Sequence, residues 1–171
     1  VIAGRFDVER RVSAGGMSAV YRATDRRTGQ PVAIKVLYGR EALEHKERLY
    51  REARILEKLS HPGIVKHVAH GETDGNGQPY LAMEWISGET LSKRLSRSGL
   101  TMAESVKVVT RVAESLAVVH ARGVIHRDIK PGNLILRDGD ADRPSLIDFG
   151  IARIGLAASA ITNTGVMLGT L

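Results

Sequence analysis

The chain has 171 residues, no cysteine and a formal net charge of +6. This length is sufficient for one domain with a sizeable core. The absence of cysteine excludes disulfides and thiolate metal sites, and it fits a reducing compartment. No apolar run reaches the roughly 20 residues that a membrane-spanning helix needs, and the N-terminus lacks the pattern of a signal peptide. We do not expect a nucleic-acid partner, because Lys and Arg are interspersed with acids and no aromatic platform accompanies them.

Three short strands are predicted near the N-terminus. Residues 6–12 and 19–23 alternate between apolar and polar side chains, and residues 32–37 are apolar except for Lys35. The first two strands flank the small residues Ser13-Ala-Gly-Gly-Met-Ser18, whose backbone N–H groups can approach a phosphate closely. An ordinary Gly-Gly hairpin turn is the alternative interpretation of that stretch.

Lys35 is the single charge in an apolar strand, and a buried cation needs a partner. Residues 41–59 are predicted to form an amphipathic helix that ends before Pro62. Acidic side chains on this helix are candidate partners of the lysine. The apolar residues expected near one face of the helix are Leu43, Leu49, Ala53, Leu56 and Leu59.

Two more strands are predicted at residues 64–69 and 79–85, around a glycine-rich loop. His67 and His70 lie on or beside the first of them. We interpret these histidines as structural rather than as metal ligands, because no third ligand is nearby in the sequence. A short helix is then expected to begin at Ser87-Gly88 and to end at Gly99.

A longer helix is predicted from Thr101 to about residue 121. Thr101 and Glu104 have the spacing of a capping box, in which each side chain bonds to the backbone N–H of the other residue. Gly123 follows the helix and ends it. The residues expected to form the buried stripe of this helix are Val108, Val112, Leu116 and Val119.

Polar side chains follow the short apolar runs that come next. Asp128, Lys130 and Asn133 lie between Ile125 and a run of apolar residues, and Asp148 follows another short apolar run. Asn and Asp supply the oxygen ligands that Mg²⁺ prefers. An acid such as Asp128 can accept the proton of an attacking hydroxyl, and Lys130 can balance charge on a phosphoryl group. These residue types together suit phosphoryl transfer, whereas nothing beside His126 supplies the serine of a hydrolase triad.

The order His126-Arg-Asp-Ile-Lys-Pro-Gly-Asn133, followed by Asp148-Phe-Gly150, resembles the catalytic motifs of the protein kinase family. Val32-Ala-Ile-Lys35 resembles the lysine strand of that family, and the resemblance extends over the whole chain. It implies an α+β, bilobal fold with a complete small β-rich lobe over residues 1–86 and an incomplete helical large lobe over residues 87–171. The similarity is strongest to the bacterial branch, whose members phosphorylate Ser and Thr hydroxyls on proteins.

The resemblance implies a role for each motif residue. Asp128 would be the catalytic base, assisted by Lys130, and Asn133 and Asp148 would hold Mg²⁺, or Mn²⁺ as the alternative. Lys35 would contact the phosphates of ATP and would be steadied by Glu52, with Glu47 and Glu57 as less favoured partners. Met83 would close the pocket behind the adenine. The nucleotide contacts that the resemblance implies, besides Lys35 and Asp148, are Val12, Ser13, Gly15, Gly16, Ser18, Val20, Ala33, Met83, Glu84, Ile86 and Ile135.

The phosphate loop departs from the family pattern, because Ser13 and Ser18 stand where the first and third glycines would be. Serine loses the easy access of glycine to positive φ, so we expect a stiffer loop or weaker nucleotide binding. Gly15 keeps the central position. Two alternative functions stay open at this point: a nucleotide-binding pseudokinase or scaffold, and a small-molecule phosphotransferase of related fold.

Regulation through residues 155–165 is a further expectation. These residues are small and polar, as is typical of a loop that phosphorylation can order. Thr162 or Thr164, or less favourably Ser159, would be phosphorylated by a second copy of the kinase in a homodimer and would pair with Arg127. Gly169-Thr170 resembles the start of the segment that docks the acceptor residue, where Thr170 would contact Lys130 and Asp128.

We expect the sequence to be a fragment, because it stops at Leu171, before the Ala-Pro-Glu motif of the family. Apolar surface on the helix of residues 101–121 and around His126 would then face water. The kinase domain is expected in the cytoplasm, and a parent protein could carry a membrane anchor beyond Leu171. The expected partners are ATP and protein substrates with Ser or Thr acceptors.

Overall fold

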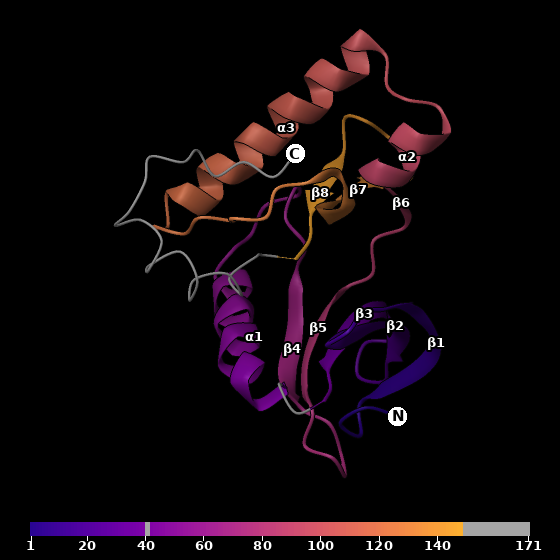
Figure 1. Cartoon of the computed structure of the whole chain (residues 1–171), viewed down its shortest axis with the longest axis vertical. Coiled ribbons are helices and arrows are strands. Elements are labelled where there is room, and N and C mark those ends of the chain that lie inside the picture. Colours follow the sequence, from indigo (N-terminus) through magenta and orange to yellow (C-terminus); the bar gives the residue numbers. More distant parts are fainter. Residues whose placement is uncertain (40–41, 149–171) are drawn as a thin grey trace.

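The computed structural model of this chain describes residues 1–39 and 42–148 (Figure 1). The side chains of Leu43 and Glu44 are likewise outside the description. The first part of the chain forms a sheet with one helix against it, and the second part forms a small sheet beneath a long helix. The elements of the first part are β1 (Phe6–Ala14), β2 (Ser18–Asp25), β3 (Pro31–Leu37), α1 (Ala42–Glu57), β4 (His67–Glu72) and β5 (Pro79–Glu84). Those of the second part are β6 (Gly88–Thr90), α2 (Leu91–Arg97), α3 (Met102–His120), the 3₁₀ turn η1 (Pro131–Asn133), β7 (Leu134–Arg137) and β8 (Pro144–Leu146).

The larger sheet has five antiparallel strands in the order β1-β2-β3-β5-β4. Residues directly opposite each other on neighbouring strands point to the same face of a sheet. Val20 lies opposite Lys35, and Ala33 lies opposite Met83. Because Ala33 and Lys35 are two positions apart on β3, all four side chains share one face. Sequence reasoning had assigned all four to the nucleotide site.

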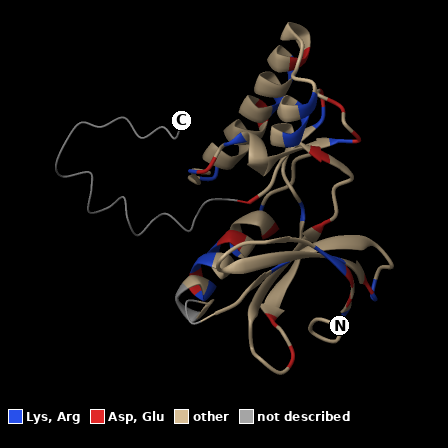
Figure 2. Ribbon diagram, turned by 45° about the vertical axis from the view of Figure 1, so that its right-hand side comes forward, with Lys and Arg blue, Asp and Glu red and all other residues tan. Residues whose placement is uncertain are grey.

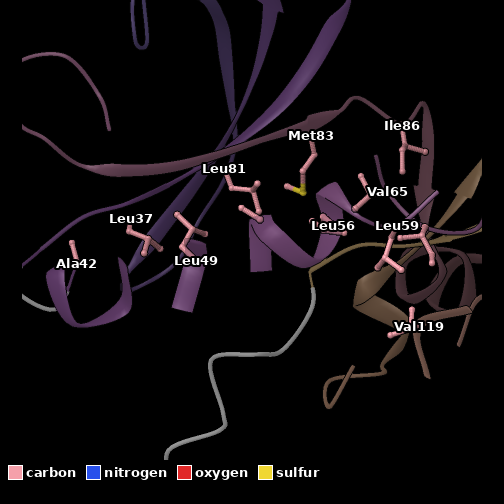
Figure 3. Packing of buried hydrophobic residues seen from close by; sticks show 12 residues of the cluster. Leu37, Ala42, Leu49, Leu56, Leu59, Val65, Leu81, Met83, Ile86 and Val119 are labelled. Carbon is pink, nitrogen blue, oxygen red and sulfur yellow. The ribbon is translucent and has the colours of Figure 1, made fainter. Parts of the chain in front are cut away.

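Helix α1 packs on that same face of the sheet, next to β4 and β5 (Figure 1). Its buried residues recur at helical spacing, as the sequence predicted, and Figure 3 shows them meeting Leu81 and Met83 of β5. The same cluster continues to Ile86 and to Val119 of α3, so one core joins the two parts of the chain. Burying each such side chain stabilises the fold by roughly 1.5–3 kcal/mol. Of the apolar residues predicted for the buried face of this helix, Leu49, Ala53, Leu56 and Leu59 are buried.

The strand predicted at residues 64–69 begins later than expected, because β4 starts at His67. Residues 64–66 precede β4. Ile64 and Val65 lie against β8, with the N–H of Val65 donating to the carbonyl of Leu146 at 2.9 Å, whereas the carbonyl of Lys66 accepts from the N–H of Glu84 at 2.9 Å. The N–H of Leu146 donates in turn to the carbonyl of Gly63, also at 2.9 Å. The predicted strand at 64–69 was therefore wrong at its start, because a partner far along the chain competes for these backbone groups. The contact ties the two sheets together.

Strand β6 was not predicted. Sequence reasoning had a helix beginning at Ser87-Gly88, but Gly88 lies opposite Arg137 of β7 and the helix starts only at Leu91. Gly88 has a φ of 142°, and a Cβ built there would lie 2.0 Å from the carbonyl oxygen of Leu136. Only glycine permits this close approach of two backbones. Thr90 then caps α2 by accepting a hydrogen bond from the N–H of Lys93.

The capping box of α3 is confirmed. The side chain of Thr101 accepts a hydrogen bond from the N–H of Glu104 at 3.2 Å, and the Glu104 carboxylate accepts from the N–H of Thr101 at 2.8 Å. Of the predicted stripe, Val108 and Val119 are buried, whereas Val112 and Leu116 are partly buried.

Apolar side chains are also exposed on α3 and around His126 in the catalytic loop (residues 126–133), as the sequence predicted. Met102, Val106 and Val109 are 82%, 59% and 68% exposed, respectively. Ile125 and Ile129 are also exposed, on either side of the buried His126. Figure 2 shows that much of α3 carries neither acidic nor basic residues, whereas both kinds are interspersed on α1.

A buried ion pair lies at the end of β2, and it was not predicted from the sequence. The Asp25 side chain is 1% exposed, and its carboxylate receives two hydrogen bonds from the Arg5 guanidinium, at 2.8 and 2.6 Å. It also accepts from the N–H of Arg27 at 3.0 Å. The hydrogen bonds from Arg5 lower the pKa of Asp25 to about 2.

We expect Asp25→Asn to lower the free energy of unfolding by about 2 kcal/mol near pH 7, because it leaves Arg5 without its counter-charge. The lowered pKa of Asp25 sets the sign of the pH dependence. The contribution of the pair is complete above about pH 4, the ordinary pKa of an aspartate, and is lost as the pH falls toward 2. The gap between wild type and variant should therefore shrink in acid, as measured by urea denaturation.

Asp7→Asn is the matched control, because Asp7 pairs with Arg26 in an exposed bidentate contact one strand away. It should change stability little, since exposed ion pairs are screened by solvent. Equal stability of Asp25→Asn and wild type near neutral pH would contradict the assignment.

Candidate active site

Lys35 is placed by β3 at the centre of the larger sheet and meets acids from two other segments. Its ammonium group lies 4.0 Å from a carboxylate oxygen of Glu52 on α1 and forms a closer hydrogen-bonded ion pair with Asp148. Glu52 is nearly buried, with a side chain that is 6% exposed. Glu47, an alternative partner in the sequence, instead pairs with Arg54 on the surface of the helix. The predicted contact between Lys35 and Glu52 is therefore present.

These acids determine the protonation of Lys35. Burial disfavours the charged form of an amine and would lower its pKa. The nearby charges of Glu52 and Asp148, with a smaller contribution from Asp128, outweigh that effect and raise the pKa of Lys35 above its ordinary value. The lysine therefore stays cationic at neutral pH and can bind an anion.

The catalytic loop gathers three of the predicted residues around one carboxylate. The Asp128 carboxylate accepts hydrogen bonds from Lys130, at 2.7 Å, and from the side-chain amide of Asn133, at 2.9 Å. The same amide also donates to the backbone carbonyl of Asp128 at 2.9 Å. The turn η1 brings Asn133 back toward Asp128, with the Asn133 N–H donating to the Lys130 carbonyl. Asp128 thus stays partly accessible, with an 18% exposed side chain held in a defined orientation.

The backbone is strained at two positions beside the predicted catalytic residues. Arg127 has a φ of 65° and Asp148 a φ of 59°, both in the left-handed region that non-glycine residues rarely adopt. Such conformations cost roughly 1–3 kcal/mol each and concentrate at functional sites. They orient the two carboxylates of Asp128 and Asp148 at the expense of local stability.

His126 lies beneath this loop and is 1% exposed. Its burial lowers the pKa of His126, against the opposing effects of Asp128 and Asp148. A neutral, buried imidazole matches the predicted role as a core residue rather than as a base.

The predicted phosphate loop is the turn between β1 and β2. The N–H of Gly15 donates to the carbonyl of Ser18 at 2.8 Å, and the hydroxyl of Tyr38 donates to the carbonyl of Gly15. Sequence reasoning missed Tyr38, because nothing in its local pattern connects it with residues more than 20 positions away. Neither Ser13 nor Ser18 has a positive φ. The departures from glycine at these positions therefore impose no backbone strain in this conformation.

The glycines of this turn have room around them. A Cβ built on Gly15 would lie 3.8 Å from the Ser18 carbonyl oxygen, an ordinary contact, and one on Gly16 would meet no atom within 4 Å. The protein itself therefore leaves space above the loop backbone. Val12, on β1 before the turn, is 43% exposed.

Residues 84–86, which the family resemblance assigns to the hinge between the two lobes, lie partly in the core and partly against the second sheet. Met83 and Ile86 are buried in the cluster that packs on α1, and Ile135 of β7 packs partly buried against it. The Glu84 carboxylate instead accepts a hydrogen bond from Arg137 of β7 at 2.7 Å. The side chain of Glu84 thus fastens the hinge to the second sheet, and Arg137 is a partner that sequence reasoning missed.

The side-chain oxygens of Asn133 and Asp148 suit a metal cation that phosphate oxygens also bind. The Asn133 amide nitrogen donates to Asp128, so the carbonyl oxygen of the same side chain is the atom that could ligate a metal. The Asp148 carboxylate is 45% exposed and could supply a second oxygen. Within residues 1–39 and 42–148, no group of three or more His, Asp or Glu side chains could hold a metal by itself. One or two protein oxygens completed by substrate phosphates is the arrangement that Mg²⁺ prefers.

Some predicted residues cannot be placed. Phe149 and Gly150, the phosphorylation candidates Ser159, Thr162 and Thr164, and the docking segment at Gly169-Thr170 all lie outside the described residues. The structure does bring Lys35, Glu52 and Asp148 together in one cluster and Asp128, Lys130 and Asn133 together in another. The two clusters are neighbours, because the N–H of Ile147, the residue before Asp148, donates to the carbonyl of Asn133 at 3.0 Å.

Comparison with known proteins identifies this arrangement. The profile of the protein kinase domain matches residues 6–170. The serine/threonine-protein kinase PknA of Mycobacterium tuberculosis (strain ATCC 25177 / H37Ra) is 36% identical over 175 residues, which cover 99% of this chain and 40% of that protein. The serine/threonine-protein kinase pkn2 of Myxococcus xanthus is 38% identical over 175 residues, covering 99% of this chain and 21% of that protein. The crystal structure of the M. tuberculosis PknI kinase domain matches with a TM-score of 0.77 at 31% identity, covering 93% of this chain and 65% of that one.

The chain belongs to the protein kinase family. It is similar to bacterial serine/threonine-protein kinases, and the predicted α+β, bilobal kinase fold is confirmed. The chain spans 40% or less of the length of the two curated relatives. The division of the chain at residue 86 stays a prediction.

None of the helices in the described part of the chain combines the length and the apolar character that crossing a membrane requires.

We expect Glu52→Gln to lower the pKa of Lys35, because it removes one of the two nearby negative charges that keep the ammonium form stable. Competitive labelling with an amine-reactive reagent, read by mass spectrometry across alkaline pH, would report this as a several-fold faster reaction of Lys35. Glu47→Gln, on the same helix, should leave the labelling of Lys35 unchanged, since Glu47 pairs with Arg54. Identical Lys35 reactivity in wild type and Glu52→Gln would show that the pair has no electrostatic effect.

Proposed function

We propose that this chain forms the nucleotide-binding and catalytic site of a serine/threonine protein kinase. The observation that carries the proposal is the meeting of Lys35, Glu52 and Asp148 beside the Asp128–Lys130–Asn133 cluster. Phosphoryl transfer from ATP depends on such positioned charges, since the protein contributes little covalent chemistry. The printed names of the relatives, each a serine/threonine-protein kinase, support the class of acceptor.

The nucleotide would bind between the larger sheet and the catalytic loop. Val20, Ala33 and Met83 would contact the adenine from the sheet, and backbone groups of the turn at residues 13–18 would contact the phosphates. Lys35 would hold the α- and β-phosphates, with Glu52 keeping its ammonium group in place. Asn133 and Asp148 would hold Mg²⁺, or Mn²⁺, which when bound neutralises charge on the phosphates.

Asp128 would act on the acceptor. Its carboxylate would take the proton from a Ser or Thr hydroxyl as the hydroxyl oxygen bonds to the γ-phosphorus. The bond between that phosphorus and the β–γ bridging oxygen breaks, and ADP leaves. Lys130, 2.7 Å from the Asp128 carboxylate, would stabilise negative charge on the transferred group and orient the base.

Regulation is proposed through Arg127, which is exposed beside the catalytic aspartate. A phosphate on Thr162 or Thr164, or on Ser159, would pair with its guanidinium and would be added by a second copy of the kinase. A cytoplasmic kinase domain acting on protein substrates is the setting that fits this chemistry. Phosphopeptide mapping that found this segment unmodified in fully active enzyme would contradict the regulatory proposal.

The central test separates the roles of the two aspartates. We expect Asp128→Asn to lower kcat by about 10²-fold or more, because the base acts only on the acceptor, while changing the Kd for Mg·ATP less than about twofold. Asp148→Asn should instead raise the Kd for Mg·ATP about tenfold and should have much less effect on metal-free nucleotide. Radiolabelled ATP with a generic protein acceptor measures the first effect, and calorimetry with and without Mg²⁺ measures the second.

Asp142→Asn is the control, since Asp142 forms an exposed pair with Arg111 of α3. It should match wild type in both measurements. If Asp128→Asn and Asp148→Asn lost nucleotide affinity equally, the division of roles would be wrong. If wild type bound nucleotide but transferred no phosphate to any protein, the pseudokinase alternative would replace the proposal.

A further inference from the structure

Two arginines lie on the same face of the sheet as the proposed nucleotide contacts Val20, Ala33 and Met83, toward the edge strand β1. Arg10 of β1 lies directly opposite Arg22 of β2, and Arg22 lies opposite Ala33 of β3, which in turn lies opposite Met83. Residues in such a row share a face of the sheet. The arginines therefore lie on the face that carries the adenine-contacting positions.

Like charges directly opposite each other on neighbouring strands repel. Two contacts offset this repulsion. A β-bulge between Val8 and Arg10 accompanies Glu9, whose carboxylate lies 3.1 Å from the Arg22 guanidinium. The indole ring of Trp85 meets both arginines: the guanidinium carbons of Arg22 and Arg10 lie 5.1 and 5.8 Å from its centre. Both distances are within the range of a cation–π interaction.

Trp85 belongs to the hinge, not to the hairpin that carries the arginines. It directly follows β5, and its N–H donates to the carbonyl of Pro31 at the start of β3, at 3.2 Å. This backbone hydrogen bond fixes the main chain of Trp85 at the adenine end of the proposed site. The two cation–π contacts connect this hinge residue with the β1–β2 hairpin.

The hairpin lies at the edge of the larger sheet, and its tip is exposed. β1 is an edge strand, and residues near the tip such as Val12 and Met17 are 43% and 48% exposed. Tyr38 holds the tip through Gly15 and Met17. The contacts with Trp85 lie nearer the middle of the hairpin, three to four residues from the turn. The hairpin is thus fastened at the phosphate end by Tyr38 and at the adenine end by Trp85.

We propose that Arg10, Arg22 and Trp85 form a clasp that sets the height of the hairpin above the adenine and thereby sets nucleotide affinity. The two arginines are positioning residues, since they act through Trp85 and the hairpin rather than by touching the reacting atoms. The inference rests on the proposed function, because it assumes that nucleotide binds beneath this hairpin. It extends that function by naming residues that no catalytic motif contains.

The chain offers a direct readout, because Trp85 is its single tryptophan. We expect Arg10→Ala/Arg22→Ala to shift the tryptophan emission to longer wavelength in the absence of nucleotide, as the indole loses its two covering side chains. The Kd for Mg·ADP and the KM for ATP should rise about 3- to 10-fold, because two cation–π contacts are lost. kcat should stay within about twofold of wild type, because the clasp does not touch the acceptor side.

Two further variants separate the clasp from a general structural effect. Arg10→Lys/Arg22→Lys keeps both cations and should recover most of the affinity and of the emission wavelength. Arg11→Ala, the neighbouring position on β1 opposite Tyr21, should resemble wild type in every measurement. Thermal unfolding of each variant checks that the fold is intact, and Arg10→Gln alone provides the same test if the double alanine variant does not fold.

The outcomes are distinguishable. If wild type binds Mg·ADP and the alanine variant binds it equally well, the inference is wrong whatever the emission shows. A rise in KM that the lysine variant does not reverse would also overturn it. If wild type binds no nucleotide, the proposed function fails instead, and the emission shift then reports only whether the contacts with Trp85 exist in solution.

Discussion

One buried cation constrains the whole arrangement. Lys35 lies in the central strand of the larger sheet, where an ammonium group without counter-charges would be costly. Its partners come from elsewhere: Glu52 from the helix on the sheet, and Asp148 from the segment after β8. Within the fold, the carboxylates that offset the burial of this lysine come from the helix on the sheet and from the second part of the chain. The ion-pair cluster around Lys35 therefore forms only when the two parts of the chain are packed together.

The docking of the two parts relies on contacts that are independent of this cation. A continuous apolar cluster runs from Leu37 on β3 to Val119 on α3 (Figure 3). Backbone hydrogen bonds join Val65 and Gly63 to Leu146, and the Arg137–Glu84 ion pair joins β7 to the hinge. These contacts place Asp148, two residues after β8, within reach of Lys35. Packing thus supplies the stability, and the strained φ of Asp148 gives the final orientation of the carboxylate.

Much of this could be predicted from the sequence, because local patterns carry it. Alternation located β1 and β2, an apolar run located β3, the capping box located the start of α3, and the motif spacing selected Glu52 over Glu47 as the partner of Lys35. The contacts of Asp128, Lys130 and Asn133 are also local, since the three residues lie within a span of six positions.

The features that escaped prediction depend on partners far along the chain. The start of β4 and the existence of β6 are decided by pairing with β8 and β7. The Arg5–Asp25 pair, the Tyr38–Gly15 hydrogen bond and the contacts of Arg10 and Arg22 with Trp85 follow from sheet register and bulges. No local sequence pattern predicts these contacts, because each of these residue types is common in the element where it occurs.

The most direct test of the central claim is the NMR signal of the Lys35 ammonium group during titration with Mg²⁺ and a non-hydrolysable ATP analogue. The account predicts a saturable shift of this signal that depends on Mg²⁺, because the ammonium group would then bond to phosphate oxygens beside Asp148. A protein that binds the analogue with the same affinity while the Lys35 signal stays unchanged would contradict the account, since the nucleotide would then lie elsewhere.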